Sequence, residues 1–232
     1  MNDGDKGIRI ALCMHGLCTG KNDKGDFVSF SKSHDYLKRN IIEPSENVDV
    51  FIHTWAEDGD IITNTTDVYA PKRALFEKQI LFDHNKTKLH STRSRWYSYK
   101  KVVQLKADYE KQNNFTYDYV LVARFDNCFL TPFSFSEYDS DSFYSSNWAF
   151  PHNIDGFLDY WFLSSSEIMD RFSSLYDKMD EYLHNDKIIL SNHSLAKHHA
   201  DKLNLKQKYI KKEHIDFGLE RRESLFKVEE KS

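Results

Sequence analysis

Apolar residues gather in short runs along the chain, and their spacing separates candidate strands from candidate helices. The segment GIRIALCMHG (7–16) is an almost continuous apolar run that ends at a glycine, as a buried strand followed by a loop does. Beyond the glycine-bearing loop GLCTGKNDKG, apolar or half-apolar residues recur at helical spacing at Phe27, Phe30, His34, Leu37 and Ile41. The two patterns predict a strand followed by a helix.

Further elements follow in alternation. VDVFIHTW (48–55) is a second candidate for a buried strand, and after a polar loop DVYAPKRALFE (67–77) is a short strand interrupted by Pro71. SRWYSYKKVVQLKADYEKQ (94–112) places its apolar residues on one helical face. It leads into the apolar run YDYVLVARFDNCFL (117–130), which predicts another buried strand.

The C-terminal part of the chain continues this pattern. DSFYSSNWAF and DGFLDYWFLSSS are candidate strands. Ser164 and Glu167 have the spacing of a capping box at the start of an amphipathic helix. A last helix is expected near 191–204, before a charged C-terminal tail, 206–232.

Strands alternating with helices in this order predict the α/β fold class. We expect an open, mainly parallel twisted sheet, Rossmann-like, with helices on both faces. A chain of 232 residues has the size of one domain, 1–232. Ligands of such sheets bind beyond the carboxyl ends of the strands, so the loops after residues 14, 54 and 123 should meet on one rim.

Composition and charge narrow the class of protein. The aromatic share is high, at 15%, and aromatic residues often line a polar ligand's pocket as well as a core. A net charge of -4 and dispersed lysines and arginines argue against a nucleic-acid partner. The first apolar run contains Arg9 and is too short to cross a bilayer, so we expect no transmembrane segment.

The cysteine count points to a compartment. Cys13, Cys18 and Cys128 are an odd number and lack the spacing of a disulfide framework or a zinc site. Reduced thiols indicate a cytoplasmic protein, which for a viral protein means the host cytoplasm.

The end of the run YDYVLVARFD carries the first candidate chemistry. Side chains of a strand repeat every second residue, so Arg124 and Asp126 share a face at the rim of the sheet. The carboxylate could hold a hard divalent cation, and the guanidinium could bind a phosphate or hold the carboxylate. From the residues alone, an ion pair at a strand end and half of a binding site are equally good interpretations.

Four phrases in order, DVFIHTW, Y-x-P-K, a YS helix and YD-x-V-x-x-R-x-D, resemble a group of bacterial and viral glycosyltransferases of the GT-A type. The resemblance covers roughly residues 7 to 183. It implies a GT-A-like sheet that binds a nucleotide-sugar donor and passes the sugar to a glycan acceptor. It also implies that Arg124 and Asp126 replace the usual D-x-D motif, with Mn²⁺ or Mg²⁺ at Asp126.

The resemblance also divides the domain and assigns donor contacts. It implies a nucleotide-binding half (1–110) and a metal and acceptor half (111–205). The rim loops and the start of the helix before the metal strand should contact the nucleotide or its phosphates. The candidate donor-binding residues are His15, Gly16, Thr19, Lys21, Trp55, Lys72, Arg95, Tyr97 and Arg124.

An inverting transferase needs a carboxylate that takes the proton of the acceptor hydroxyl. The segment DGFLDYWFLSSSEIMDRF resembles the family segment in which an aspartate precedes an aromatic strand. Asp159 is the first candidate for the catalytic base and Asp155 the second, with loop capping or acceptor binding as the other interpretation of each.

Three further features have competing interpretations. His193, His198 and His199 lie five and six residues apart, which does not fit a zinc helix, so a solvated helix is expected there. GLCTGKN suggests a P-loop kinase or sulfotransferase, but Gly16 and Gly20 enclose three residues instead of four. A non-catalytic protein of the same fold that binds a sugar or a partner is a further alternative. A different α/β enzyme is the third, although no serine-elbow, dinucleotide or haloacid-type motif is present.

Overall fold

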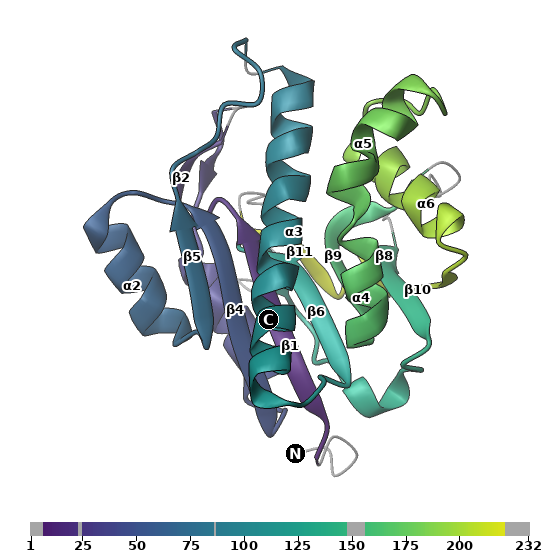
Figure 1. Cartoon of the computed structure of the whole chain (residues 1–232). Coiled ribbons are helices and arrows are strands. Elements are labelled where there is room, and N and C mark those ends of the chain that lie inside the picture. The colour runs from purple at the N-terminus through teal and green to yellow at the C-terminus, as the bar shows by residue number, and fades with distance from the viewer. Residues whose placement is uncertain (1–6, 23–24, 86, 148–155, 221–232) are drawn as a thin grey trace.

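The structure is a computed structural model, which describes residues 7–22, 25–85, 87–147 and 156–220. Asp155, the second candidate for the base, and the end of the expected tail, residues 221–232, lie outside these residues. Within the described part, a central sheet of seven strands organises the molecule (Figure 1). Its spatial order is β10-β8-β9-β6-β1-β4-β5.

The sheet is mainly parallel. Strands β1 (Arg9–Gly16), β4 (Asn47–Trp55), β5 (Arg73–Glu77) and β6 (Tyr119–Arg124) run parallel to one another. Strand β9 (Leu158–Ser164) is antiparallel to both of its neighbours, β6 and β8 (Ser142–Asn147). The edge strand β10 (Lys206–Lys212) pairs with β8 in parallel. The α/β class and the mainly parallel sheet are therefore confirmed.

Both faces of the sheet are buried, which explains the continuous apolar run of β1. Ile10, Leu12 and Met14 belong to one hydrophobic core, whereas Ala11 and Cys13 belong to the other. Helices α3 (Lys88–Asn113), α4 (Ser166–Phe172), α5 (Leu175–His184) and α6 (Asn192–Lys202) cover the second core.

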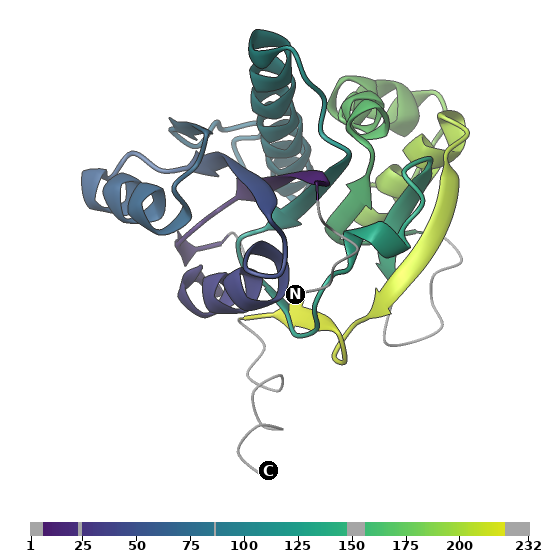
Figure 2. The same cartoon turned by 90° about the horizontal axis from the view of Figure 1, so that it is seen from below.

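Helix α1 (Ser31–Leu37), the π-helical turn η2 (Lys38–Ile42) and α2 (Gly59–Tyr69) pack on the first core. Figure 2 shows α3 and α1 on opposite sides of the sheet. The expectation of helices on both faces is confirmed. A short pair of strands, β7 (Asn127–Phe129) with β11 (Phe217–Leu219), and the turn η3 (Phe135–Glu137) complete this layer.

Several predicted boundaries are wrong in the N-terminal half. Phe27 belongs to a short strand, β3 (Phe27–Val28), which pairs with β2 (Gly20–Lys21), so the helix begins only at Ser31. The polar loop after β4 contains helix α2, whose first turn is capped by the Asp58 side chain through the amides of Asp60 and Ile61. Strand β5 therefore starts after Pro71 instead of being interrupted by it.

The C-terminal half also differs from the prediction. Ser164 lies in β9 and donates its hydroxyl hydrogen to Ser142 O, so the expected capping box does not form. The helix expected there is two helices, α4 and α5. The charged tail contains two strands, β10 and β11, which pack Tyr209 and Phe217 against the hydrophobic cores. The many lysines around these two residues hide the strand pattern in the sequence.

Two further findings concern the membrane and the thiols. Among the described residues, no helix is long and apolar enough to cross a membrane. Cys13, Cys18 and Cys128 are buried free thiols.

Candidate functional site

The order of the strands defines where a ligand should bind. Counted along the chain, β5-β4-β1-β6 has the order 3-2-1-4, so the chain leaves β1 toward one side and returns on the other. In open α/β sheets such a switch point opens a crevice beyond the carboxyl ends of the two central strands. Here these ends are His15–Gly16 of β1 and Arg124 of β6.

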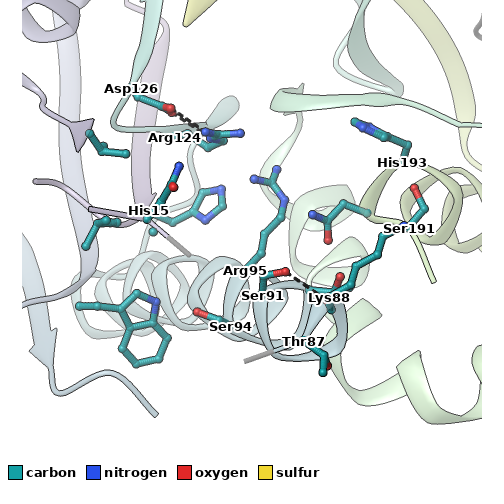
Figure 3. A pocket seen from close by; sticks show the side chains of 17 residues that line it. His15, Thr87, Lys88, Ser91, Ser94, Arg95, Arg124, Asp126, Ser191 and His193 are labelled. Carbon is teal, nitrogen blue, oxygen red and sulfur yellow. Dashed lines mark hydrogen bonds and ion pairs between the residues drawn. The ribbon is translucent and has the colours of Figure 1, made fainter. Parts of the chain in front are cut away.

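A pocket of about 720 Å³ lies at this switch point. Side chains from the ends of β1, β4 and β6 form one wall, and the first turns of α3 and α6 form the other (Figure 3). The lining comprises His15, Gly16, Leu17, Asn22, Val28, Trp55, Thr87, Lys88, Ser91, Thr92, Ser94, Arg95, Arg124, Asp126, Ser191, Asn192 and His193.

The strand pattern explains which polar groups reach the pocket. Cys13, Phe51 and Val122 point toward α3 and belong to the same core. Two residues further on, the same face of β1, β4 and β6 carries His15, His53 and Arg124, which lie side by side in the strand register. The apolar core beneath α3 therefore ends in a row of polar side chains.

Arg124 and Asp126 form a bidentate ion pair. Arg124 Nε donates to Asp126 Oδ1 at 2.9 Å, and a terminal nitrogen of Arg124 donates to Oδ2 at 2.6 Å. The Asp126 side chain is 3% exposed and that of Arg124 21%, so the cation faces the pocket and the carboxylate lies behind it. Burial lowers the pKa of Arg124, but Asp126 and Asp159 outweigh burial and raise it, so the guanidinium keeps its charge.

Arg95 supplies a second fixed cation from α3. Its Nε lies 2.9 Å from Asp159 Oδ2, and its terminal nitrogen donates to the backbone oxygen of Asp159. Burial would raise the pKa of the Asp159 carboxyl, but Arg95, His193 and Arg124 hold it below its ordinary value. The pocket thus contains two arginines from different elements, each fixed by a buried carboxylate.

His15 lies between these cations. It is 2% exposed, and its Nδ1 has no hydrogen-bond partner among the described residues. Burial, followed by the charges of Arg95 and Arg124, holds its pKa well below the ordinary value, so the ring is neutral. Because His15 also lines the pocket, this atom can pair with a ligand or water that enters it.

A hydrogen-bonded chain behind the pocket fixes the β1 loop. Gly16 N donates to Ser98 Oγ at 2.8 Å, and the same Oγ lies 2.7 Å from His53 Nδ1. His53 Nε2 lies 2.8 Å from Glu77 Oε2. Gly16 has φ of 99°, a left-handed conformation that glycine adopts without strain. The loop at the switch point is therefore held in one place.

An aromatic pair closes one end of the pocket. Trp55 lines it and is 7% exposed. Tyr97, which does not line the pocket, stacks on Trp55 with ring centroids 5.4 Å apart and planes 20° apart. Tyr97 thus supports the tryptophan from behind.

The structure brings five of the nine predicted donor-binding residues and Asp126 to the pocket, and leaves four, Tyr97, Lys72, Thr19 and Lys21, outside its lining. Lys72 precedes β5 and therefore lies at the amino edge of the parallel strands, where it pairs with Asp49 at 3.4 Å. Thr19 lines a separate hollow beside α1 and α2, and Lys21 is exposed on β2. The predicted residues that line the pocket are His15, Gly16, Trp55, Arg95, Arg124 and Asp126.

Apart from Arg95, sequence reasoning missed the lining from α3, and it missed the lining from α6 entirely. Helix α3 begins at Lys88, six residues before the predicted start, and its first turns face the pocket. Lys88, Ser91 and Arg95 follow i, i+3, i+7 spacing, so extending the helix backward from Arg95 would have found them. The sequence marks His193 only as a member of a histidine cluster.

That histidine cluster divides among three environments. His198 pairs with Asp186 at 2.7 Å, and His199 is buried against Tyr182, while His193 lines the pocket. The expectation of a solvated helix is wrong, because α6 buries Leu195 and three further residues.

The prediction of Mn²⁺ or Mg²⁺ at Asp126 stays a prediction, but the donor set does not fit it. Both oxygens of Asp126 are occupied by Arg124, and Asp159 faces Arg95. The described residues contain no group of three metal-ligating side chains. Three cations, Lys88, Arg95 and Arg124, and the carboxylate of Asp126 line the pocket. With the buried Asp159 behind Arg95 counted, one net positive charge remains, which favours an anion.

Two comparisons with known proteins found no similar protein. No protein-family profile matches the chain, and no curated protein matches it. The resemblance to GT-A glycosyltransferases rests on the four quoted phrases.

Proposed function

We propose that the protein is a GT-A-like glycosyltransferase, which moves a sugar from a nucleoside-diphosphate sugar to the hydroxyl group of a glycan or another acceptor. The observation that carries the proposal is the pair of fixed arginines, Arg95 and Arg124, at the switch point of a Rossmann-like sheet. Two guanidiniums on one pocket match the two negative phosphoryl groups of a diphosphate.

The size and walls of the pocket support a ligand of this kind. A volume of about 720 Å³ falls within the range of roughly 300–1,000 Å³ for small-molecule sites. Trp55 offers an aromatic edge for a nucleobase, and the hydroxyls of Thr87, Ser91 and Ser94 offer hydrogen bonds to ribose or donor sugar. The pocket thus offers cations for the phosphates, an aromatic ring for the base and hydroxyl groups for the sugar.

The chemical task of such a pocket is to stabilise a leaving group. When the bond between the sugar and the diphosphate breaks, negative charge grows on the departing diphosphate. Fixed cations in a partly buried site stabilise that charge without reorganising, which is the largest contribution in many enzymes. In this proposal Arg95 and Arg124 perform the task, with His15 Nδ1 as a further polar contact, and no step requires a metal.

The test is a thermal-shift screen of the purified protein against UDP-, GDP-, TDP- and CMP-sugars, followed by mass spectrometry of donor breakdown. A ligand at 100 times its dissociation constant stabilises by about 2.7 kcal/mol. We expect one nucleotide class to raise the melting temperature and its sugar to be released. Arg95→Met, with binding about 10- to 100-fold weaker, should cut the shift to about half or less at the same ligand concentration.

Arg93→Met is the matched control, because Arg93 lies two residues away on the same helix, pairs with the exposed Asp180 and does not line the pocket. A protein that binds a sugar nucleotide but never breaks it down would instead be a non-catalytic binder. A shift with ATP or a sulfonucleotide alone would contradict the proposal and favour a kinase or sulfotransferase.

The geometry after β1 does not favour that last alternative. A P-loop passes directly from a strand into the first turn of a helix, where free amides hold the phosphates. Here β1 leads into the β2–β3 pair, and the amide of Gly16 is occupied by Ser98. Lys21 is exposed on β2 and does not line the pocket.

A further inference from the structure

His193 lines the pocket on the side opposite Arg124, and it shares the carboxylate of Asp159 with Arg95 (Figure 3). It is the second residue of α6, and in Figure 3 its ring points from that helix toward the side where Arg124 lies. The side chain is 35% exposed. It is therefore accessible to a ligand that the arginines hold.

Two acceptors orient the His193 ring through one nitrogen. Nδ1 lies 2.7 Å from the backbone oxygen of Phe157 and 3.2 Å from Asp159 Oδ1. Because a carbonyl oxygen can only accept, Nδ1 carries the hydrogen in the neutral ring. The neutral tautomer then has its basic lone pair on Nε2.

The backbone around His193 is fixed as well. Phe157 N donates to the backbone oxygen of His193 at 3.1 Å, so the start of α6 is tied to the start of β9. A Cβ atom at Gly156 would lie 2.8 Å from His193 C and Cβ, so only glycine permits this close approach. Such support on both sides is what holds a reacting group in position.

We propose that His193 is the general base of the transfer reaction and that Asp159 is its positioning residue. This inference rests on the proposed function. Asp159 joins the two halves of the site, because one oxygen contacts His193 and the other contacts Arg95. A carboxylate in this position fixes the tautomer of the imidazole and stabilises the imidazolium that forms.

The proton and electron movements balance. The acceptor oxygen forms a bond to the anomeric carbon of the donor sugar and gives its proton to Nε2 of His193. The bond between that carbon and the diphosphate oxygen breaks, and its electron pair leaves with the nucleoside diphosphate, which Arg95 and Arg124 neutralise. The imidazolium returns its proton to solvent after the products leave.

This assignment changes the role expected for Asp159. As the base, Asp159 would have to reach the acceptor, yet it is 4% exposed and does not line the pocket. Its lowered pKa also makes it a weak proton acceptor. These features suit a fixed counterion better than a base.

The experiment compares His193→Asn with His198→Asn, a variant of the same helix whose histidine lies outside the pocket. Donor hydrolysis, in which water replaces the acceptor, is measured with UDP-glucose and GDP-mannose, and UDP and GDP binding by calorimetry. General bases contribute about 10²- to 10⁴-fold. We expect His193→Asn to lose that factor in kcat with little change in nucleotide affinity, and His198→Asn to retain both.

Two further variants separate catalysis from structure. His193→Gly with added imidazole should recover part of the lost rate, which a purely structural role would not allow. Asp159→Asn should lower both kcat and nucleotide affinity, because Asp159 also holds Arg95.

The outcomes distinguish the two proposals. A wild-type protein that hydrolyses a sugar nucleotide, with His193→Asn equally active, overturns the role of His193 and leaves the proposed function intact. Loss of turnover in Asp159→Asn alone would return the role of base to Asp159. A wild-type protein that neither binds nor breaks down any donor overturns the proposed function, and the role of His193 with it.

Discussion

Replacing Asp126 with asparagine tests whether this carboxylate serves Arg124 or a metal ion. The change keeps the shape of the side chain and removes its charge. In the native protein the pair has two short contacts, 2.6 and 2.9 Å, and the Asp126 side chain is 3% exposed. Asp126→Asn therefore leaves a largely buried guanidinium without its counterion.

The magnitude follows from the burial of the two partners. Breaking a buried ion pair costs about 3–5 kcal/mol, and because 21% of the Arg124 side chain is exposed to the pocket we expect about 3 kcal/mol, the low end. For a chain of this length, 1 kcal/mol shifts Tm by about 2–4 °C, so Tm should fall by about 6–12 °C.

The assay is urea denaturation, with calorimetric titration of UDP and GDP in the presence of EDTA. Asp180→Asn is the control, because Asp180 is 61% exposed and its pair with Arg93 should contribute less than about 1 kcal/mol. Removing both charges with Arg124→Met/Asp126→Leu should restore much of the stability. In Asp126→Asn, metal-free nucleotide affinity should change less than about tenfold, since the lost orientation of Arg124 is offset by a more positive pocket.

Two results would refute this reasoning. If Asp126→Asn destabilised the protein no more than Asp180→Asn, the pair would not be a buried, mutually stabilising one. If nucleotide binding required Mn²⁺ in the wild type and disappeared in the variant, Asp126 would be a metal ligand.

Three further predictions concern the groups behind the pocket and the second core. Ser98→Ala should remove the hydrogen bonds of its hydroxyl with Gly16 N and His53 Nδ1, at about 1–3 kcal/mol for each buried group left unpaired, measured by urea denaturation. Lys106→Met should cost about 3–5 kcal/mol, because Lys106 is fully buried and Glu110 would lose its 2.9 Å partner; a Tm change below about 2 °C, from the same scale, would contradict this. Burial lowers the pKa of His199 from 6.5 to about 4, so the unfolded chain takes up a proton that the folded chain does not, and stability should fall as the pH drops from 6.5 toward 4; His199→Phe should flatten this pH dependence.

Much of the sheet could be predicted because its central strands are buried on both faces. Continuous apolar runs such as that of β1 are typical of strands covered on both sides, and the predicted strands at residues 48–55 and 117–130 contain most of β4 and all of β6. The alternation of side chains along a strand predicted that Arg124 and Asp126 lie close together, although β6 ends at Arg124 and Asp126 belongs to the turn that follows. Only the folded structure shows that Arg124 and Asp126 pair with each other and also line a pocket.

The missed elements share a physical cause. Helix α2 has a polar sequence with threonines and an asparagine, and it is stabilised by its cap and by burial of Tyr69 more than by helix propensity. Strand β10 has lysines on both sides of the adjacent Tyr209 and Ile210, and it forms because β8 offers it an edge. Local composition does not report such tertiary partners.

The candidate site illustrates the same limit of local patterns. Most of the pocket residues that the sequence predicted lie at the carboxyl ends of parallel strands. The direction of the strand then determines at which edge of the sheet such a residue lies. Lys72 was assigned to the site because it belongs to the Y-x-P-K phrase. It precedes the parallel strand β5, however, and therefore lies at the edge of the sheet opposite the pocket. His193 reaches the pocket only because α6 is tied to Phe157, a contact between segments 36 residues apart.

The central claim is that two arginines hold a nucleoside diphosphate at the switch point. Its most direct test is calorimetric titration of UDP and GDP into the wild type, Arg95→Met, Arg124→Met and Arg93→Met, with EDTA and again with Mn²⁺. Charged hydrogen bonds are worth about 1.5–3 kcal/mol, so each pocket variant should bind about 10- to 100-fold more weakly, with or without metal, and Arg93→Met should match the wild type. Binding that Arg95→Met and Arg124→Met leave unchanged, or no binding by the wild type, would contradict the claim.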